Sequence, residues 1–466
     1  MATLNTAFNI ATGALDANQA AINIIANNTA NANTPGYTNE LPQWQENDPV
    51  TINGTSYGQG VTMSGAESQR DLILEQRIQQ QTQLQYDTDA RQTALTSIEN
   101  IFSGATSTSS SGSLDIGNSI SGFFSALSQL QSDPADSSLR QSVLSAANTL
   151  ASSFQAASSQ LTQEQSSLDQ QSTTLVTQVN SLTKAIAQLN QSIAQNGDSN
   201  QLEDQRQYDI QQLSQLIGIH QTTTEDNGLT ITTSNGALLV AKGQSFSLST
   251  SMSGGVTQIS DSQGNNITAS LAGAGGQLGG ILTVRDQDIP QMQSALDTLA
   301  FDLGTAINAQ NAEGADANGN PGGAIFNLPS SATGAAASIS VAITDPSQIA
   351  AASSGSGSSN DGNLEIMLQL QNQGIISGST ASAYYSSFVS TLGSLVSAVS
   401  SSNTAQQASL TQLQTQRNSL SAVNQNDEAA ALENLQQSYE AAAKVFTILD
   451  TIMASALNLG VQTTVS

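Results

Sequence analysis

The strongest constraint on this chain is a heptad-like spacing of apolar residues at both of its ends. Near the N-terminus the stripe advances in steps of 4 and 3 residues: Leu4, Phe8, Ala11, Leu15, Asn18, Ile22 and Ile25. Near the C-terminus the same steps connect Leu432, Leu435, Tyr439, Ala442, Phe446, Leu449, Met453 and Ala456. This spacing is typical of a coiled-coil seam. We predict two long terminal helices, about 42 Å and about 50 Å in length, that pair with each other; the alternative is that each folds separately onto a globular body.

The interior of the chain carries a longer seam of the same kind. It runs from Leu161 to Ile193 and follows Asp133-Pro134, a helix-entry signal with proline expected in the first turn. We expect one helix of about 55 residues, closed by Gly197 at a C-cap-like position. A shorter helix should follow from Asn200 to about Ile217, and helical spacing returns between Ile289 and Ile307.

Between these helical segments the apolar period changes to two. In "NGLTITTSNGALLVAKGQSFSL" apolar residues alternate with threonines, and Asn235-Gly236 indicates a hairpin with a type I′ turn. The stretch ends in "LAGAGGQLGG", which we expect to be a loop, and "ASISVAI" predicts one further short strand.

The predicted fold class is mainly α with a β-rich insert. Its parts are a terminal coiled-coil helix pair, a long helical rod domain and a small projecting β domain. The expected boundaries are 1–60 for the N-terminal helix and turn, 61–218 and 284–414 for the two parts of the rod, 219–283 for the β domain, and 415–466 for the C-terminal helix.

Composition excludes several classes of partner. The chain has 466 residues, of which 38% are apolar and 10% charged, and its formal net charge is −26. A cationic groove for nucleic acid or anionic lipid is not expected at this charge. No apolar run reaches the length of a membrane span, and no basic residue precedes Arg70, so neither a span nor a secretory signal is predicted. These residues by themselves indicate a cytoplasmic protein.

The sequence offers little for catalysis or metal binding. It contains no cysteine, and His220 is its single histidine, which we interpret as a partly exposed loop residue. "GAGGQLGG" does not have the glycine spacing of a dinucleotide loop, and "DANGNPGG" lacks the spacing of a calcium loop. We therefore expect no enzyme activity, no cofactor and no metal site.

Two terminal stretches resemble a known family. "ANNTANANTPGYTNE" is similar to the N-terminal signature of the bacterial flagellar rod, hook and hook-associated proteins, and "LQQSYEAAAKVFTILDTIMASALNL" resembles their C-terminal helix. Three interior stretches narrow the resemblance to the hook-associated proteins of the hook–filament junction. They are "DPADSSLRQSVLSAANTLASSF", "NQLEDQRQYDIQQLSQLIGIH" and "DIPQMQSALDTLAFDLGTAINAQNAEGADANGNPGGAIF".

The resemblance implies a structural role that composition could not indicate. It implies a ring of copies of this chain between hook and filament, with the hook protein and a second hook-associated junction protein as neighbours. It also implies an export chaperone that docks on the C-terminal helix, and no contact with nucleic acid or membrane. Export through the flagellar type III channel without a cleavable signal would place the protein outside the cell, in the flagellum, and would replace the cytoplasmic interpretation.

The asparagines before the Pro-Gly turn acquire a role in this context. An amide at a seam position selects register and partner, because a mismatched neighbour leaves the amide buried without a hydrogen-bond partner. We therefore expect Asn18, Asn27, Asn28 and Asn31 to select the neighbouring subunit. Thr34, Pro35, Gly36 and Tyr37 should end the helix, with Pro35 and Gly36 central in a type II turn and Tyr37 as an anchor.

Three functions of different classes remain open at this point. The first is a junction protein of the flagellum. The second is the flagellar hook protein or another axial structural protein, whose middle should be nearly all β, against which the seam from Leu161 to Ile193 argues. The third is an enzyme carried on the β insert, which the single His220 disfavours, because no carboxylate pair stands near it to share proton transfer.

Overall fold

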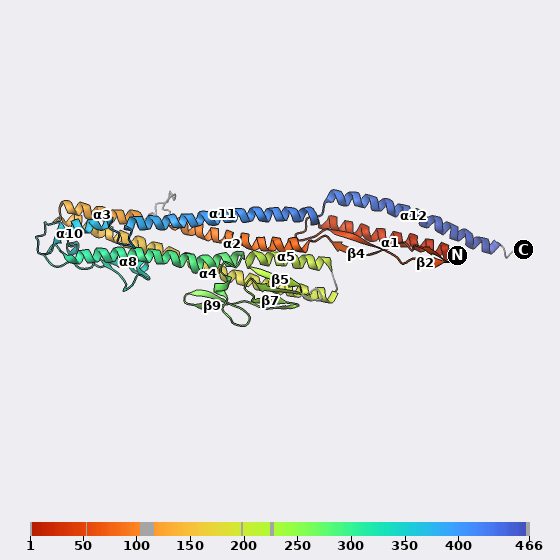
Figure 1. Ribbon diagram of the computed structural model, residues 1–466, viewed down its shortest axis with the longest axis horizontal. Helices are drawn as coiled ribbons and strands as arrows, with labels where there is room; N and C mark the ends of the chain where they lie inside the picture. Colours follow the sequence, from red (N-terminus) through yellow and green to blue (C-terminus); the bar gives the residue numbers. More distant parts are fainter. Residues whose placement is uncertain (1, 53, 103–115, 197–198, 224–227, 463–466) are drawn as a thin grey trace.

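The computed structural model describes residues 2–52, 54–102, 116–196, 199–223 and 228–462. The molecule is strongly elongated, with both chain ends at the same end of its long axis (Figure 1). Three parts follow one another along that axis or beside it: a terminal helix pair, a helical rod, and a β domain on one side of the rod. The chain is 66% helical, which agrees with the predicted mainly α class.

The rod is a bundle of long helices that lie along the axis (Figure 1). Its helices are α2 (Leu72–Phe102), α3 (Ile116–Ser132), α4 (Ser137–Asn196), α5 (Asn200–Leu216), α7 (Gly276–Thr283), α8 (Ile289–Glu313), α10 (Gly362–Gln369) and α11 (Ala381–Ser421). The 60 residues of α4 extend over about 90 Å. One continuous apolar core runs through this bundle, and Phe123, Phe124 and Phe154 are among its fully buried members.

The beginning of α4 differs from the expectation for Pro134. The Asp136 carboxylate caps the helix, because Oδ1 accepts from the backbone N–H groups of Ser138 at 2.6 Å and Leu139 at 3.2 Å. Pro134 lies in the turn before the helix rather than in its first turn. The predicted closing residue, Gly197, lies outside the described residues.

Hydroxyl side chains allow a serine- and threonine-rich chain to form such long helices. Thr149 donates to the carbonyl of Ser145 at 3.0 Å, and Thr447 donates to the carbonyl of Ala443 at 2.8 Å. Each hydroxyl thereby satisfies itself on the preceding turn of its own helix. The polar composition therefore does not require loops.

The terminal unit contains more than two helices. It consists of α1 (Ala2–Asn31), α12 (Gln425–Gln462) and an unpredicted pair of hairpins, in which β1 (Glu40–Glu46) pairs with β4 (Val61–Ser68) and β2 (Val50–Ile52) pairs with β3 (Thr55–Tyr57). The expected boundary at residue 60 falls inside this hairpin. The expected boundary at residue 415 falls inside α11, which continues to Ser421 before the chain turns into α12.

The β domain is a four-stranded antiparallel sheet with a separate hairpin. The sheet has the order β5 (Ile219–Thr223), β6 (Leu229–Thr233), β7 (Leu238–Ala241) and β8 (Gln244–Ser245), and the hairpin joins β9 (Ser249–Ser253) to β10 (Val256–Ser260). The predicted hairpin at Asn235-Gly236 is present, but its turn is not type I′. Gly236 has a φ of +89° and its N–H bonds to the carbonyl of Thr233 at 2.9 Å, whereas among the described residues only Lys242 and Ser377 are non-glycine residues with positive φ. This is a type I turn followed by a left-handed glycine.

The glycine-rich stretch at the end of the β insert is a loop only over residues 272–275, because the buried helix α7 begins at Gly276. After the short α6 (Thr268–Leu271), α7 packs against α2, and its glycines permit the approach. A Cβ on Gly280 would lie 2.2 Å from the carbonyl oxygen of Asp87, and one on Gly276 would lie 2.4 Å from the nitrogen of Ile217. The glycines therefore serve helix packing, and residues 276–283 belong to the rod.

The β domain is attached firmly to α4. The Asn180 amide makes two 2.8 Å hydrogen bonds to the backbone of Leu248, and Asp169 accepts from both the N–H and the hydroxyl of Thr257 at 2.7 Å. Arg285 is fully buried and pairs with Asp169 at 2.8 Å from the π-helical turn η1 (Val284–Asp288), which joins α7 to α8. Apolar residues of the sheet also belong to the continuous core of the rod.

Short elements complete the end of the rod that is farthest from the chain termini (Figure 1). They are β11 (Gly314–Ala315), β12 (Phe326–Asn327), α9 (Ala335–Ser338), β13 (Ser340–Val341), β14 (Ala352–Ser353) and the 3-10 turns η2 (Pro346–Gln348) and η3 (Leu370–Asn372). The strand expected in "ASISVAI" is reduced to the two residues of β13, since α9 precedes it. Asp316 accepts from the N–H groups of Asn318 and Asn320 at 2.8 Å, which makes "DANGNPGG" a carboxylate-closed turn.

Candidate assembly site at the terminal helix pair

The two predicted seams meet, because α1 and α12 lie side by side along the terminal unit (Figure 1). The rings of Phe8 and Phe446 are in contact, with their centroids 4.7 Å apart. Aromatic pairs at this separation contribute beyond the area that they bury. The pairing of the chain ends was predicted, and the structure confirms it.

The N-terminal seam is buried unevenly. Ala11, Ile25 and Asn28 are buried, Asn27 is exposed, and the rest are partly buried, namely Leu4, Phe8, Leu15, Asn18, Ile22 and Asn31. Sequence reasoning missed Ala17 and Ile24, which are buried as well. The reason is that α1 is covered on a second side by β1 and β4, with the carbonyl of Val61 lying 3.4 Å from a Cβ built on Gly13.

The C-terminal seam is buried only in part. Tyr439 and Ala456 are exposed, and the other six predicted positions are intermediate: Leu432, Leu435, Ala442, Phe446, Leu449 and Met453. A second apolar stripe on α12 flanks the face toward α1, about a quarter turn around the helix, where Val445, Ile448 and Ile452 are 50%, 60% and 47% exposed. Their spacing of 3 and 4 residues repeats that of a seam. Helix α12 thus carries two apolar faces, of which α1 covers one.

Asn28 fastens the end of α1 to three other segments of the same chain. Its side chain is 1% exposed and donates to the carbonyl of Glu40 at 2.8 Å and to the Glu428 carboxylate of α12 at 3.2 Å. It accepts from the Tyr37 hydroxyl at 2.8 Å and from the Glu40 N–H at 3.1 Å. A buried amide with all these partners specifies one arrangement of helix, turn and hairpin.

The other seam amides also have partners within the chain. Asn18 donates to the carbonyl of Ala14, one turn back, at 2.8 Å. Asn31 donates to Asn27 Oδ1 at 2.8 Å, and Asn27 donates to the Tyr37 hydroxyl at 3.4 Å. That these amides also select a neighbouring subunit stays a prediction.

The turn after α1 has the predicted geometry. The Tyr37 N–H bonds to the carbonyl of Thr34 at 3.2 Å, and Gly36 has a φ of +83°, as a type II turn with Pro35 and Gly36 at its centre requires. Gly36 packs on Tyr208 of α5, where an added Cβ would approach within 2.9 Å. Burial raises the pKa of Tyr37, and the charges of Glu40, Asp204 and Glu428 act in the same direction. Tyr37 therefore stays a neutral hydroxyl donor to Asn28.

A polar joint connects the terminal unit to the rod. Arg70 pairs with Asp204 of α5 and donates to the Thr38 hydroxyl at 2.7 Å, while the Thr38 N–H donates to Asp204 at 2.9 Å. Across the joint, the Asn39 N–H bonds to the carbonyl of Ser421 at 2.9 Å. Burial raises the pKa of Asp204, although Arg70 and Thr38 act in the opposite direction. No residue that the structure describes in α1 or α12 belongs to the apolar core of the rod, and hydrogen bonds and one ion pair dominate this joint.

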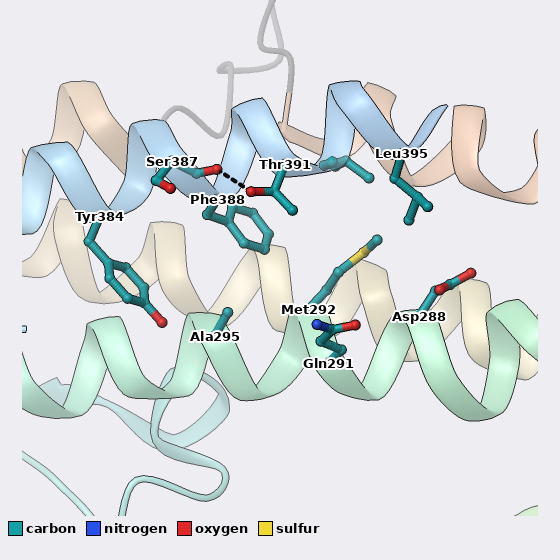
Figure 2. Close-up of a pocket in the computed structure, with 10 residues that line it drawn as sticks. Asp288, Gln291, Met292, Ala295, Tyr384, Ser387, Phe388, Thr391 and Leu395 are labelled. Carbon is teal, nitrogen blue, oxygen red and sulfur yellow. Dashed lines mark hydrogen bonds between the residues drawn. The ribbon is translucent and has the colours of Figure 1, made fainter. Parts of the chain in front are cut away.

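The described residues offer no arrangement for catalysis. A groove of about 240 Å³ lies between α8 and α11, where Met292 and Phe388 point into the space between the helices (Figure 2). Its one carboxylate, Asp288, is held by Arg91 at 3.1 Å. His220 is exposed on strand β5, not in a loop as expected. Within the described ranges no three carboxylates or imidazoles come together as metal ligands.

No described helix combines the length and the apolarity that a membrane crossing requires. In the long helices of the rod and of the terminal unit, polar residues interrupt every run of apolar residues before it could span a membrane. The burial patterns of these helices are those of a packed bundle and of a two-helix pair.

Comparison with known families identifies both parts of the molecule. Residues 95–326 match the family described as flagellar hook-associated protein FlgK helical domain, and residues 8–38 match the flagella basal body rod protein family. The first match covers helices α3 to α8 with the β domain between them. The second covers the N-terminal seam and the turn at Thr34–Tyr37.

Curated relatives extend the similarity over most of the chain. The chain is 28% identical to flagellar hook-associated protein 1 of Bacillus subtilis, with 96% of each chain covered. It is 26% identical to the protein of the same name from Salmonella typhimurium, covering 70% of this chain and 60% of that one. The chain thus spans 60% of the length of the Salmonella relative.

A solved structure has the same fold. The flagellar hook junction protein FlgK from Burkholderia pseudomallei superposes with a TM-score of 0.68 at 21% identity, covering 74% of this chain and 99% of that one. At this identity the likeness concerns the fold of the two chains. The family match over residues 95–326 and the relatives that cover most of the sequence show that the chain belongs to the family of the flagellar hook-associated protein FlgK.

Proposed function

We propose that this chain is a structural subunit of the bacterial flagellum, without enzyme activity, that assembles with copies of itself into the junction between hook and filament and is required for filament assembly. The relatives are named hook-associated proteins, and the solved relative is called a hook junction protein. The long helical rod disfavours the alternative of a hook protein, whose middle should be nearly all β.

The observation that carries the proposal is the second apolar stripe of α12. Val445, Ile448 and Ile452 are about half exposed or more, at seam spacing, on a helix whose other face already contacts α1. An exposed stripe of this kind marks a binding surface. Two helices and a hairpin also bury too little apolar surface to be firmly stable by themselves. Helices of neighbouring copies would complete the unit.

The proposed partners are those of a junction ring. They are copies of this chain, the hook protein on one side, and a second hook-associated junction protein on the other. An export chaperone would bind α12 before assembly, as a helix-in-groove partner that grips one apolar face. The proposed location is outside the cell, in the flagellum, after export through the type III channel without a cleavable signal.

Electron microscopy of labelled flagella tests the role. A small tag inserted between Gly254 and Gly255, at the tip of the β9–β10 hairpin, meets open space. We expect one labelled band where the hook joins the filament. Label along the whole hook would support the hook-protein alternative, and label along the filament would contradict the proposal. Flagella built with the untagged chain and treated with the same label are the control for non-specific labelling.

Two matched double variants separate the faces of α12. Phe446→Ser with Leu449→Ser truncates the face toward α1, and Val445→Ser with Ile448→Ser truncates the second stripe. We expect both to abolish filament formation, since each loses buried side chains in every assembled copy. A variant that no longer binds the chaperone should be retained in the cell. A variant that still binds the chaperone but cannot assemble should be exported and shed into the medium. Normal filaments with the second-stripe variant would contradict the proposal; Thr447→Ser is the control.

A further inference from the structure

Exposed apolar side chains are concentrated at one end of the molecule. Among the described residues, fourteen large apolar side chains are exposed, and all except Met252 and Ile366 lie in the hairpin, in α12, or at the adjoining ends of α2 and α11. Large exposed apolar patches on a folded protein mark interaction sites. The stripe of α12 accounts for only part of this surface.

A groove between α2 and α11 forms one section of the remaining surface. Its volume is about 270 Å³, and Arg77 and Leu84 of α2 face Leu413 of α11 across it. Ile73 lies one helical turn before Arg77 on the same face of α2 and is 72% exposed, while Leu420 at the end of α11 is 53% exposed. Glutamines and a serine form most of the groove lining, with Leu84 and Leu413 as its aliphatic members and Arg77 as its one cation, and Ile73 and Leu420 extend the apolar surface beyond the end of the groove.

Arg77 gives this groove one of the few positive charges of the chain. It is exposed, and no carboxylate of the described residues lies within ion-pair distance of it. The whole chain has only 10 basic residues against 36 acidic ones. A free arginine in such a chain favours an acidic partner, and the chain itself is the nearest source of one.

The β1–β4 hairpin is the matching surface. Leu41, Trp44 and Val61 are 45%, 43% and 37% exposed on it, and Glu46 and Asp48 follow Trp44 directly. The first 69 residues contain no lysine or arginine. The hairpin is therefore both apolar and acidic, and its tryptophan belongs to the residue type most often found at the centre of an interface.

We propose that the α2–α11 groove of one copy receives the β1–β4 hairpin of a second copy, with Trp44 beside Ile73 and Leu420 at the end of the groove, and the acidic end of β1 near Arg77. The contact rests on the proposed assembly and assigns it a second interface beside the α12 stripe. It joins two different surfaces, and such head-to-tail contacts build rings and helical arrays. The partner is identified by two features of the hairpin: its acidic residues complement Arg77, and its exposed apolar residues complement those beside the groove.

Cysteine cross-linking tests the contact without disturbing its apolar residues, since the chain contains no cysteine. Gln45→Cys on β1 and Gln80→Cys on α2 are both exposed positions next to the proposed contact. The two single variants are expressed together, and their flagella are isolated and oxidised. A disulfide between the two variants can form only between copies. Glu365→Cys on α10, at the far end of the rod, replaces Gln80→Cys in the control (Figure 1).

We expect dimers that contain both Gln45→Cys and Gln80→Cys in flagella, at least about tenfold more than with Glu365→Cys, and none in the unassembled chain. Flagella that contain the variants but no such dimers would overturn the proposed contact and leave the proposed function intact. Absence of the chain from all flagella, including those of the control, would overturn both. As a second variant, Arg77→Glu should reduce the number of filaments, and Glu46→Arg with Asp48→Arg should restore them; failure of this restoration while Gln80→Cys still assembles would overturn the assigned pairing of charges.

Discussion

The rod and the terminal unit share a heptad-like spacing of apolar residues, but they differ in how far those residues are buried. In the rod, residues such as Phe123 and Phe154 are fully buried in one core that extends through the helices and into the β domain. In α12, no apolar side chain among residues 425–456, where burial is described, is buried, and the second stripe is exposed. The comparison teaches that the rod stabilises itself, whereas the terminal unit is completed by neighbours.

The largest expected effect separates these regions directly. Phe154→Ala should lower the free energy of unfolding of the rod by about 3–5 kcal/mol, because it removes a fully buried ring from a packed core. Phe446→Ala, which truncates a half-buried ring of the terminal pair, should change the same transition by less than about 0.5 kcal/mol. Urea unfolding of the two soluble variants measures both values. Equal effects would show that the two regions share one folding unit.

A glycine contact within the rod gives the next effect. Gly280→Ala should destabilise the rod by about 1–3 kcal/mol, since the new Cβ would lie 2.2 Å from the carbonyl oxygen of Asp87 and force α7 away from α2. Gly122→Ala is the matched control, because a Cβ there meets nothing within 4 Å inside helix α3. The control should be neutral or more stable by up to about 1 kcal/mol. Thermal unfolding that ranks the two variants in the opposite order would contradict the packing of α7.

A buried carboxylate should make the stability of the rod depend on pH. Burial raises the pKa of Asp87 to about 6, although Arg91 and the Gly275 N–H oppose the shift. Since the folded state binds the proton more tightly than the unfolded one, the free energy of unfolding should fall as pH rises from about 4 to about 6. Asp87→Asn should reduce this slope, and the raised pKa of Asp204 should account for part of the remainder. Urea titrations at a series of pH values provide the test, and an unchanged slope in the variant would assign the dependence to other groups.

The smallest effect on the rod is expected from the joint of the terminal unit. Asn28→Ala removes four hydrogen bonds that hold α1 to the turn, the hairpin and α12. We expect faster proteolysis between α1 and the hairpin, with unfolding of the rod unchanged within about 0.5 kcal/mol. Asn18→Ala, whose amide bonds only to its own helix, should have little effect on either measurement. A rod destabilised by Asn28→Ala would indicate that the joint couples the two regions.

The sequence predicted what periodicity determines and missed what depends on tertiary packing. The two seams, the 60-residue α4 and the turn at Pro35-Gly36 follow from spacing and local backbone preference. The β1–β4 hairpin was not predicted, because Pro42 and a bulge between Gln43 and Trp44 interrupt its alternation. The interpretation of the glycine-rich stretch as a loop was wrong for residues 276–280, since glycine disfavours an isolated helix and the close approach to α2 reverses that preference.

The same distinction applies to the candidate site. Spacing predicted the α12 face that includes Phe446, which contacts Phe8 of α1, but it did not single out Val445, Ile448 and Ile452 as a second, exposed stripe beside that face. The contact between Asn28 and Glu428 could not be predicted from the sequence either, because the two residues are 400 positions apart. The groove between α2 and α11 depends on two helices that are distant in the chain.

The most direct test of the central claim is amide hydrogen exchange of α1 and α12 in the soluble chain and in isolated flagella. If neighbours complete the terminal unit, its amides should exchange at least about 100-fold faster than those of α4 in the soluble chain and should approach the protection of α4 after assembly. Terminal helices that are already as protected as α4 in the soluble chain, with no further change in flagella, would contradict the account.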